Sequence, residues 1–240
     1  MLYDALLTEE EKALRDEVRQ FVRDEVPADL LRAMDRDEIK FPYEFIAKLA
    51  EHSLRGIRFP KKWGGRELPW TAEVVAEEEV GVLGVALGCA FVMSSIVGEA
   101  LNVFGTDEQK ERYLRPIITG TKIPEEALTE PRGGSDFFGA TTRAVADGDS
   151  FILNGQKRFV VGAEAADFFT VYCNTDPKAP LHQRISMFIV EKGPGVQVEH
   201  VYFQEFLGDL SDRRNVEMDA MGIDAEKEKI YTDEDMWRNF

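Results

Sequence analysis

The hydrophobic pattern of this 240-residue chain changes once, between Leu128 and Gly134, and this change constrains the fold more than any other feature. Before it, apolar residues recur at helical spacing; after it, short β-rich runs alternate with Pro and Gly. Helices followed by strands predict a segregated α+β architecture, whereas a βαβ sheet would interleave them. We expect a helical domain over residues 1–126, a β domain over residues 127–205 and an acidic segment of unassigned structure over residues 206–240.

Capping signals and prolines divide the helical part into four predicted helices. Pro27 is expected to stop or kink the first helix, and Pro116 is expected to end the last one. The two outer helices begin with capping boxes, in which a Thr hydroxyl and an acidic or amide side chain three residues later satisfy free backbone donors. The expected starting points are Thr8, Pro42, Pro69 and Thr106.

The strand part contains a clear hairpin signal. Residues 151–153 and 159–161 are apolar runs, and Asn154-Gly155 between them supplies the positive φ angles that a tight hairpin turn needs. We therefore predict a hairpin centred on Asn154-Gly155. Further strands are expected at 168–173, 185–190 and 196–203.

Residues Val80 to Gly98 form a stretch without any charge, which is long enough for a membrane span. Glycines and serines dilute its hydrophobicity, and Glu on both flanks gives no Lys/Arg asymmetry that would orient a span. A helix buried on all sides within a soluble bundle is the better interpretation, with small residues allowing close approach of neighbours.

Composition narrows the class of protein further. With 29 basic and 45 acidic residues, the formal net charge is −16, which disfavours binding to nucleic acid or to an anionic membrane. The N-terminus lacks the pattern of a signal peptide, and two distant cysteines fit a reducing, cytoplasmic location. The three histidines show no metal-ligand spacing, so no metal site is expected.

The segment from Ala127 to Asp136, which reads ALTEPRGGSD, has the composition of a binding loop. Its glycines let a ligand approach the backbone closely and leave N–H donors available, which suits a phosphate or a heteroaromatic ring. No Walker, Rossmann or nucleophile-elbow spacing is present. On this evidence alone, an anion or cofactor loop and a plain connecting loop both remain open. Arg132 is the basic residue of the loop that suits phosphate recognition.

Several motifs in order resemble the acyl-CoA dehydrogenase family over roughly the first two hundred residues. The first are Phe41-Pro42, the segment 54–57 and the Trp63-Gly64-Gly65 turn, which are similar to the family's N-terminal helical domain. FGTDEQKERYL at 104–114 resembles a highly specific family segment, and ALTEPRGGSD resembles the flavin loop. LNGQK at 153–157 and FIVEK at 188–192 are similar to the family's β domain.

The resemblance implies a fold and a reaction. The fold would be an all-α domain followed by a β-sandwich or barrel-like domain, with FAD as cofactor and an acyl-CoA thioester as substrate. In the family a glutamate removes the α-proton while hydride passes from the β-carbon to flavin N5, leaving a trans-2-enoyl-CoA. The implied partners are an electron-transfer flavoprotein or another acceptor, and a homo-oligomer or partner chain that supplies the helical bundle.

The same resemblance assigns site residues by position. Glu126 and Ser135 would contact the substrate, and two positions depart from the family: Glu126 replaces a common aromatic residue, and Val161 replaces a Thr or Ser that bonds flavin N5. The residues expected at the cofactor are Leu128, Thr129, Gly134, Ser135, Phe159, Val160 and Val161.

The family's C-terminal bundle, which carries its catalytic glutamate, has no counterpart in the pattern after about Phe206, so no catalytic base is assigned. Three hypotheses stay open. The chain is an FAD-dependent dehydrogenase completed by its own C-terminus or a partner; it is a truncated, non-catalytic member that binds flavin, acyl-CoA or a partner subunit; or it keeps the fold for an oxidase or desulfinase-like reaction.

Overall fold

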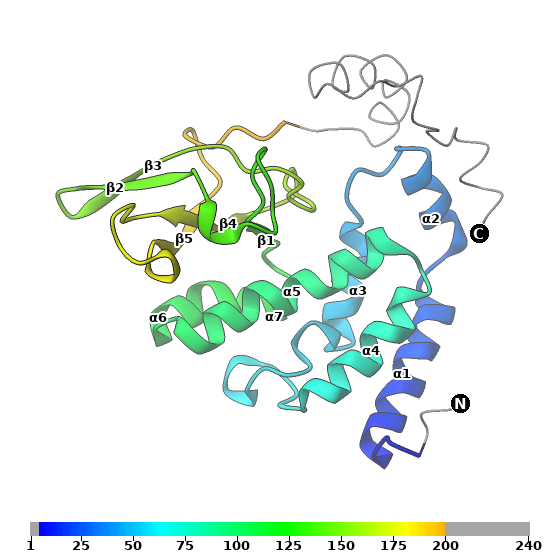
Figure 1. Ribbon diagram of the computed structural model, residues 1–240. Helices are drawn as coiled ribbons and strands as arrows, with labels where there is room; N and C mark the ends of the chain where they lie inside the picture. Colours follow the sequence, from blue (N-terminus) through cyan, green and yellow to red (C-terminus); the bar gives the residue numbers. More distant parts are fainter. Residues whose placement is uncertain (1–4, 200–240) are drawn as a thin grey trace, which may run out of the picture. The chain divides into compact units, whose positions relative to one another are not determined.

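The computed structural model describes residues 5–199, and within them the helices precede the strands (Figure 1). This confirms the predicted α+β class. The helical segments are α1 (Glu9–Glu25), α2 (Ala28–Asp35), α3 (Tyr43–Glu51), η1 (Leu54–Gly56), η2 (Lys61–Trp63), α4 (Trp70–Gly81), α5 (Val85–Phe104), α6 (Asp107–Gln109), η3 (Lys110–Leu114) and α7 (Arg115–Ile118). After the short β1 (Pro124–Ala127) and η4 (Phe137–Gly139) come β2 (Arg143–Asp147), β3 (Ser150–Asn154), β4 (Phe168–Asn174), η5 (Leu181–Gln183) and β5 (Ile185–Glu191).

Both predicted capping boxes are present. The Thr8 hydroxyl accepts a hydrogen bond from the Glu11 N–H at 3.2 Å, and the Glu11 carboxylate accepts one from the Thr8 N–H at 2.8 Å. Thr106 and Gln109 make the same reciprocal pair at the start of α6. Helix α1 ends at Glu25, so the expected stop before Pro27 is confirmed. Helix α2 was not predicted: Pro27 is also its N-cap, a place where the missing N–H of proline costs nothing.

The uncharged stretch from Val80 to Gly98 is not one helix. Helix α4 ends at Gly81, and α5 begins after Gly84, whose φ of 100° suits glycine and breaks the run. Within the described part of the chain, α5 is the one helix whose length and composition would allow it to cross a membrane. Half of the apolar 18-residue stretch of α5 is buried inside the protein. Burial on all sides was wrong for this stretch, since Val82 and Val85 are exposed.

Pro116 does not end the last helix, contrary to expectation. Helix α6 continues through a π-helical turn, η3, into α7, and Pro116 lies in the first turn of α7. The Arg115 N–H donates to the Lys110 carbonyl five residues back. The change from π to α hydrogen bonding falls at Pro116, so the absent N–H of the proline is accommodated there.

Two clusters of buried side chains form the core. The larger cluster joins α1, α3, α4 and α5 through residues such as Phe21, Phe45 and Leu49. The second cluster joins α5, η3 and α7 to the sheet, because it includes both Tyr113 and Phe168. The rings of Tyr113 and Phe168 have centroids 4.8 Å apart.

The strands of the described region form one mixed five-stranded sheet. Strand β4 is at its centre: it pairs in parallel with β1, antiparallel with β5, and in parallel with β2 at a single position. Strand β3 pairs antiparallel with β2. Among residues 5–199 there is thus one mixed sheet, which follows the helical region as expected. Helix α5 contacts β1, which places the end of that strand beside the helical region.

The predicted hairpin is wrong in its position: the turn and one of the two strands lie elsewhere in the sequence. The hairpin is β2–β3, turning at Gly148-Asp149, where Gly148 has a φ of 60°. Residues 155–163 form no strand. Gly155 is required for a different reason: a Cβ on it would overlap Thr142, so glycine lets these two backbone segments approach closely. Strands at 168–173 and 185–190 are confirmed as β4 and β5.

The predictions for the C-terminal part of the chain fall partly or wholly outside the described residues. Residues 196–199 form no strand, and the rest of the predicted strand at 196–203 lies outside the described residues. The acidic segment 206–240 also lies outside them. The boundaries at 126 and 205 stay predictions.

Candidate cofactor site

The loop after β1 folds around the carboxylate of Glu130. The backbone N–H and carbonyl groups of Glu130 and Gly133 bond each other at 3.2 and 2.9 Å, which closes a tight turn. The buried Glu130 carboxylate accepts hydrogen bonds from the Thr141 N–H and hydroxyl, both at 2.6 Å, and from the Thr142 N–H at 2.8 Å. Its fourth partner is the ammonium group of Lys157 at 3.0 Å.

These contacts keep Glu130 ionised. Burial acts to raise the pKa of Glu130, but the hydrogen bonds from Thr141 and Thr142 outweigh burial and hold that pKa far below its usual range. The Lys157 and Glu130 side chains are both buried, so their ion pair is well protected from water. Glu130 therefore acts as an anchor for the loop.

Lys157 and Arg158 attach a second segment to this loop. The Lys157 ammonium group also donates to the Leu128 carbonyl at 3.0 Å, and the Arg158 N–H donates to the Thr129 carbonyl at 2.8 Å. The loop residues Leu128 and Thr129 are thereby joined to the segment that precedes Phe159. The structure thus brings together two groups of predicted cofactor residues that are about thirty positions apart in the sequence.

The segment after Arg158 presents an aromatic ring and free backbone donors. Phe159 has a φ of 58°, rare for a residue with a side chain, and its side chain is 68% exposed. The N–H groups of Val160 and Val161 donate no hydrogen bond within the described residues. A non-glycine residue held in this conformation beside unused donors is typical of a binding site.

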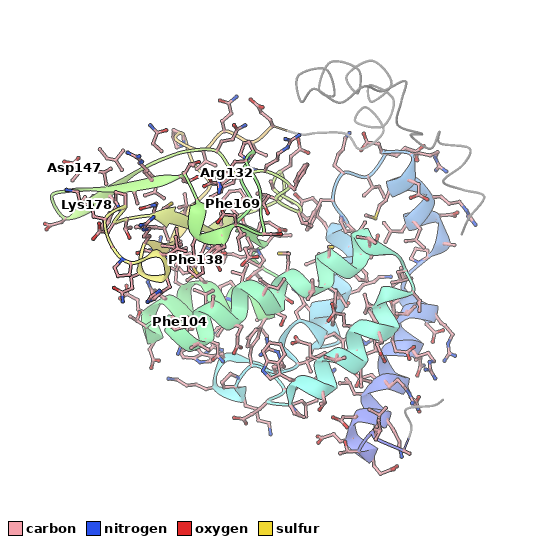
Figure 2. The ribbon with its side chains drawn as sticks, viewed as in Figure 1. Phe104, Arg132, Phe138, Asp147, Phe169 and Lys178 are labelled. Carbon is pink, nitrogen blue, oxygen red and sulfur yellow. The ribbon has the colours of Figure 1, made fainter. Side chains whose placement is uncertain are left out.

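Gly134 and Ser135 belong to the loop after β1, which also contains Thr129. A Cβ on Gly134 would be 3.0 Å from the Thr129 hydroxyl, so glycine keeps that hydroxyl uncrowded. Within the described residues, the N–H groups of Gly134 and Ser135 donate no hydrogen bond either. Arg132 forms an ion pair with Asp136 (Figure 2 labels Arg132), so its guanidinium group already has an anionic partner.

Glu126 and Glu125 face opposite sides of the sheet, as neighbouring residues of a strand do. The Glu126 carboxylate accepts a hydrogen bond from the Tyr172 hydroxyl at 3.0 Å. Burial, with the charge of Glu126 and this bond, raises the pKa of Tyr172 above its usual range. Tyr172 also lines a groove of about 780 Å³ between the end of α5, η3 and β5, which includes Phe104 and Phe188.

Glu125 is the functional candidate that the sequence analysis missed. It is 1% exposed and lies against Gly162, directly after the segment 159–161. The sequence did contain a signal for a buried carboxylate: Glu125 shares one face of its strand with the apolar residue Ala127. Burial raises the pKa of Glu125 to about 9 against the opposing charge of Arg55.

Comparisons with known proteins agree on one family. Residues 8–121 match the family model for the N-terminal domain of acyl-CoA dehydrogenase, and residues 126–205 match the one for its middle domain. The chain is 36% identical over 194 residues to a short-chain-specific acyl-CoA dehydrogenase of Clostridium acetobutylicum, covering 79% of this chain and 50% of that protein. It is 38% identical over 193 residues to the CarC subunit of the caffeyl-CoA reductase–Etf complex of Acetobacterium woodii, with 80% and 50% covered.

Solved structures give the same answer. An acyl-CoA dehydrogenase from Geobacillus kaustophilus superposes with a TM-score of 0.70 at 35% identity, over 79% of this chain and 50% of that one. The FAD complex of PigA has a TM-score of 0.75 at 27% identity, over 82% and 51%. The chain spans about half the length of the curated relatives it matches. The order of helices and sheet, the loop around Glu130 and these matches together place the chain in the acyl-CoA dehydrogenase family.

Proposed function

We propose that this chain is the flavin-binding half of an FAD-dependent acyl-CoA dehydrogenase, whose reaction converts an acyl-CoA thioester to the trans-2-enoyl-CoA. The observation that carries the proposal is the attachment of residues 157–158 to Leu128 and Thr129. It assembles the flavin loop and the 159–161 segment into one surface with free N–H donors. The FAD-bound PigA structure, similar over 82% of this chain, supports the choice of cofactor.

The residues present fit FAD. The N–H groups of Val160 and Val161 and the Thr129 hydroxyl would bind the polar edge of the flavin, and the exposed Phe159 ring would lie beside it. The N–H groups of Gly134 and Ser135 suit a phosphate, since backbone donors bind anions without a competing charge. The bound flavin would serve as a two-electron acceptor. Val161 has no side-chain donor for that edge, so only its backbone can contribute there.

Substrate binding is proposed for Glu126 and Ser135. Ser135 is exposed at the loop, where its hydroxyl is available to a phosphate of FAD or of the CoA arm. Glu126, held by Tyr172, would influence which acyl groups are accepted. We propose that the general base comes from outside residues 5–199, either from the rest of this chain or from a partner chain that supplies the helical bundle.

The proposed electron partner is an electron-transfer flavoprotein or another acceptor. One relative, CarC, is named as a subunit of a reductase–Etf complex, and another as an NADH-linked acryloyl-CoA reductase, so relatives of this chain differ in their redox partners. The two distant cysteines support a cytoplasmic location for this reaction, because they fit a reducing compartment.

The experiment is an anaerobic titration of the FAD-reconstituted chain with acyl-CoAs of increasing chain length, followed by the visible absorption of the flavin. Dehydrogenation predicts bleaching of the flavin band by at least one thioester and formation of an enoyl-CoA. A chain that retains FAD but is bleached by none of them would contradict a base supplied by this chain alone. A base from a partner chain, or the second function, would then be favoured.

The second function is that of a non-catalytic member which binds a partner subunit. The observation that favours it is a set of exposed apolar side chains on α4, on α5 and in the turn between them, since exposed apolar surface often marks interfaces. Val85 and Phe104 are 83% and 81% exposed, and Val74, Val82 and Val103 are also exposed. Sedimentation velocity tests it: association above the mass of one chain should be weakened by Phe104→Ser (Figure 2) and unaffected by Leu181→Ser, an exposed leucine on η5.

A further inference from the structure

Arg55 and Glu125 are two buried ionisable side chains that the proposed site does not explain. Arg55 on η1 is 3% exposed and Glu125 on β1 is 1% exposed. Within the described residues, Nε and Nη1 of Arg55 and Oε2 of Glu125 have no hydrogen-bond partner. A buried polar atom without a partner destabilises the folded chain, because it has given up its hydrogen bonds to water. A pair of such residues beside a proposed binding site therefore calls for a functional explanation.

The carboxyl group of Glu125 lies against the turn that follows the flavin segment. A Cβ on Gly162 would be 2.5 Å from Oε1 of Glu125 and 2.7 Å from Cε2 of Phe41, so only glycine fits over this carboxyl group. Gly162 has a φ of 65°, and its carbonyl accepts hydrogen bonds from the N–H groups of Ala165 and Ala166. The turn is thus fixed on both sides, and Val161 is its immediate neighbour.

We propose that Glu125 is a positioning residue: its carboxyl group, held beside Arg55 and under Gly162, fixes where residues 159–161 present their N–H groups to the flavin. The inference rests on the proposed function, because it concerns the same cofactor segment. Burial keeps Glu125 protonated at neutral pH, with a pKa of about 9. The carboxyl group therefore acts through its shape against Gly162, and an amide of the same shape should replace it.

The first test compares Glu125→Ala with Glu125→Gln, with Glu51→Ala as an exposed control on α3. We measure the FAD dissociation constant and the absorption spectrum of the bound flavin in the full chain. Glu125→Ala should weaken FAD binding at least tenfold and change the spectrum, whereas Glu125→Gln and Glu51→Ala should match the parent chain. Unchanged binding and spectrum in Glu125→Ala, or a loss in Glu125→Gln as large as in Glu125→Ala, would overturn the proposal.

A second test, on two glycines, keeps the proposal testable if the Glu125→Ala chain does not fold. Gly162 and Gly148 have nearly the same φ, 65° and 60°, but a Cβ on Gly148 would meet nothing within 4 Å. Gly162→Ala should weaken FAD binding at least fivefold, and Gly148→Ala should not change it. Equal FAD affinity in the two variants would overturn the proposal. If the parent chain itself retains no FAD, the proposed function fails, and this result is distinct from either outcome above.

Discussion

The carboxylate of Glu130 illustrates how single residues determine this site. It has four donors around it, three from the Thr141-Thr142 pair and one from Lys157, and burial makes each of these bonds stronger than it would be in water. Because Lys157 also holds the Leu128 carbonyl, one carboxylate stabilises both the loop and its neighbouring segment. The anchoring groups are thus distinct from the groups that would touch the cofactor.

Replacing Glu130 by Gln should destabilise the chain by about 3–5 kcal/mol, because it leaves the buried Lys157 ammonium group without its anionic partner. Chemical denaturation of the apo chain measures this loss, with Glu44→Gln, an exposed residue of α3, as control. The parent chain should also lose stability as pH falls through and below 4.5, where the unfolded Glu130 takes up a proton that the folded one resists. A loss of under about 1 kcal/mol in Glu130→Gln would contradict the anchoring role.

Glu125 should give the opposite pH dependence. Its pKa is raised from 4.5 to about 9, so between these values the folded chain holds a proton that the unfolded chain releases. The contribution of Glu125 to stability is therefore fully present below the unfolded pKa and declines as pH rises towards 9. Glu125→Gln cannot titrate, so its free energy of unfolding should fall less between about pH 6 and about pH 8.5 than that of the parent chain. Parallel curves for the two chains would show that Glu125 is ionised when folded.

At the scale of single elements, α5 contains one glycine that its packing requires and one that it does not. A Cβ on Gly98 would overlap the Phe59 ring, whereas one on Gly88 would meet nothing within 4 Å. The glycine at 98 thus allows the close approach that small residues in this apolar stretch led us to expect. The glycine at 88 has no such packing reason.

Alanine at these two positions should have effects of opposite sign. Gly98→Ala should destabilise the chain by about 1–3 kcal/mol through overpacking against Phe59. Gly88→Ala should stabilise it by about 0.5–1 kcal/mol, because alanine loses less backbone entropy in a helix. Thermal unfolding of both variants measures the difference. Equal shifts in the same direction would mean that Phe59 relaxes away from the helix.

Local signals in the sequence predicted the elements whose cause is local. Capping boxes placed the starts of α1 and α6, because their hydrogen bonds span three residues. The hairpin was misplaced because Gly155 serves a close approach to Thr142, which is distant in sequence, and not a turn. Glu125 was missed for the same kind of reason: its neighbours Arg55 and Gly162 lie 70 and 37 positions away in opposite directions.

At the scale of the whole described region, the helices and the sheet are held together through η3. Tyr113 packs on Phe168, and its hydroxyl donates to the Glu191 carboxylate at 3.1 Å, which also accepts a bond from Arg112 at 2.9 Å. The motif at 104–114 was recognised by resemblance to a family. Its structural role, which is to join the α and β parts, became visible only in three dimensions.

The most direct measurement of the central claim is the dissociation constant for FAD of three purified chains: the parent, Lys157→Met and Lys178→Met. Lys157 joins Glu130 to the Leu128 carbonyl, while Lys178 is an exposed lysine of the β4–β5 connection (Figure 2). We predict that the parent and Lys178→Met retain FAD through gel filtration and that Lys157→Met loses at least tenfold in affinity. A flavin site built from these two segments would be contradicted if Lys157→Met bound FAD with parental affinity. It would also be contradicted if none of the three chains retained FAD.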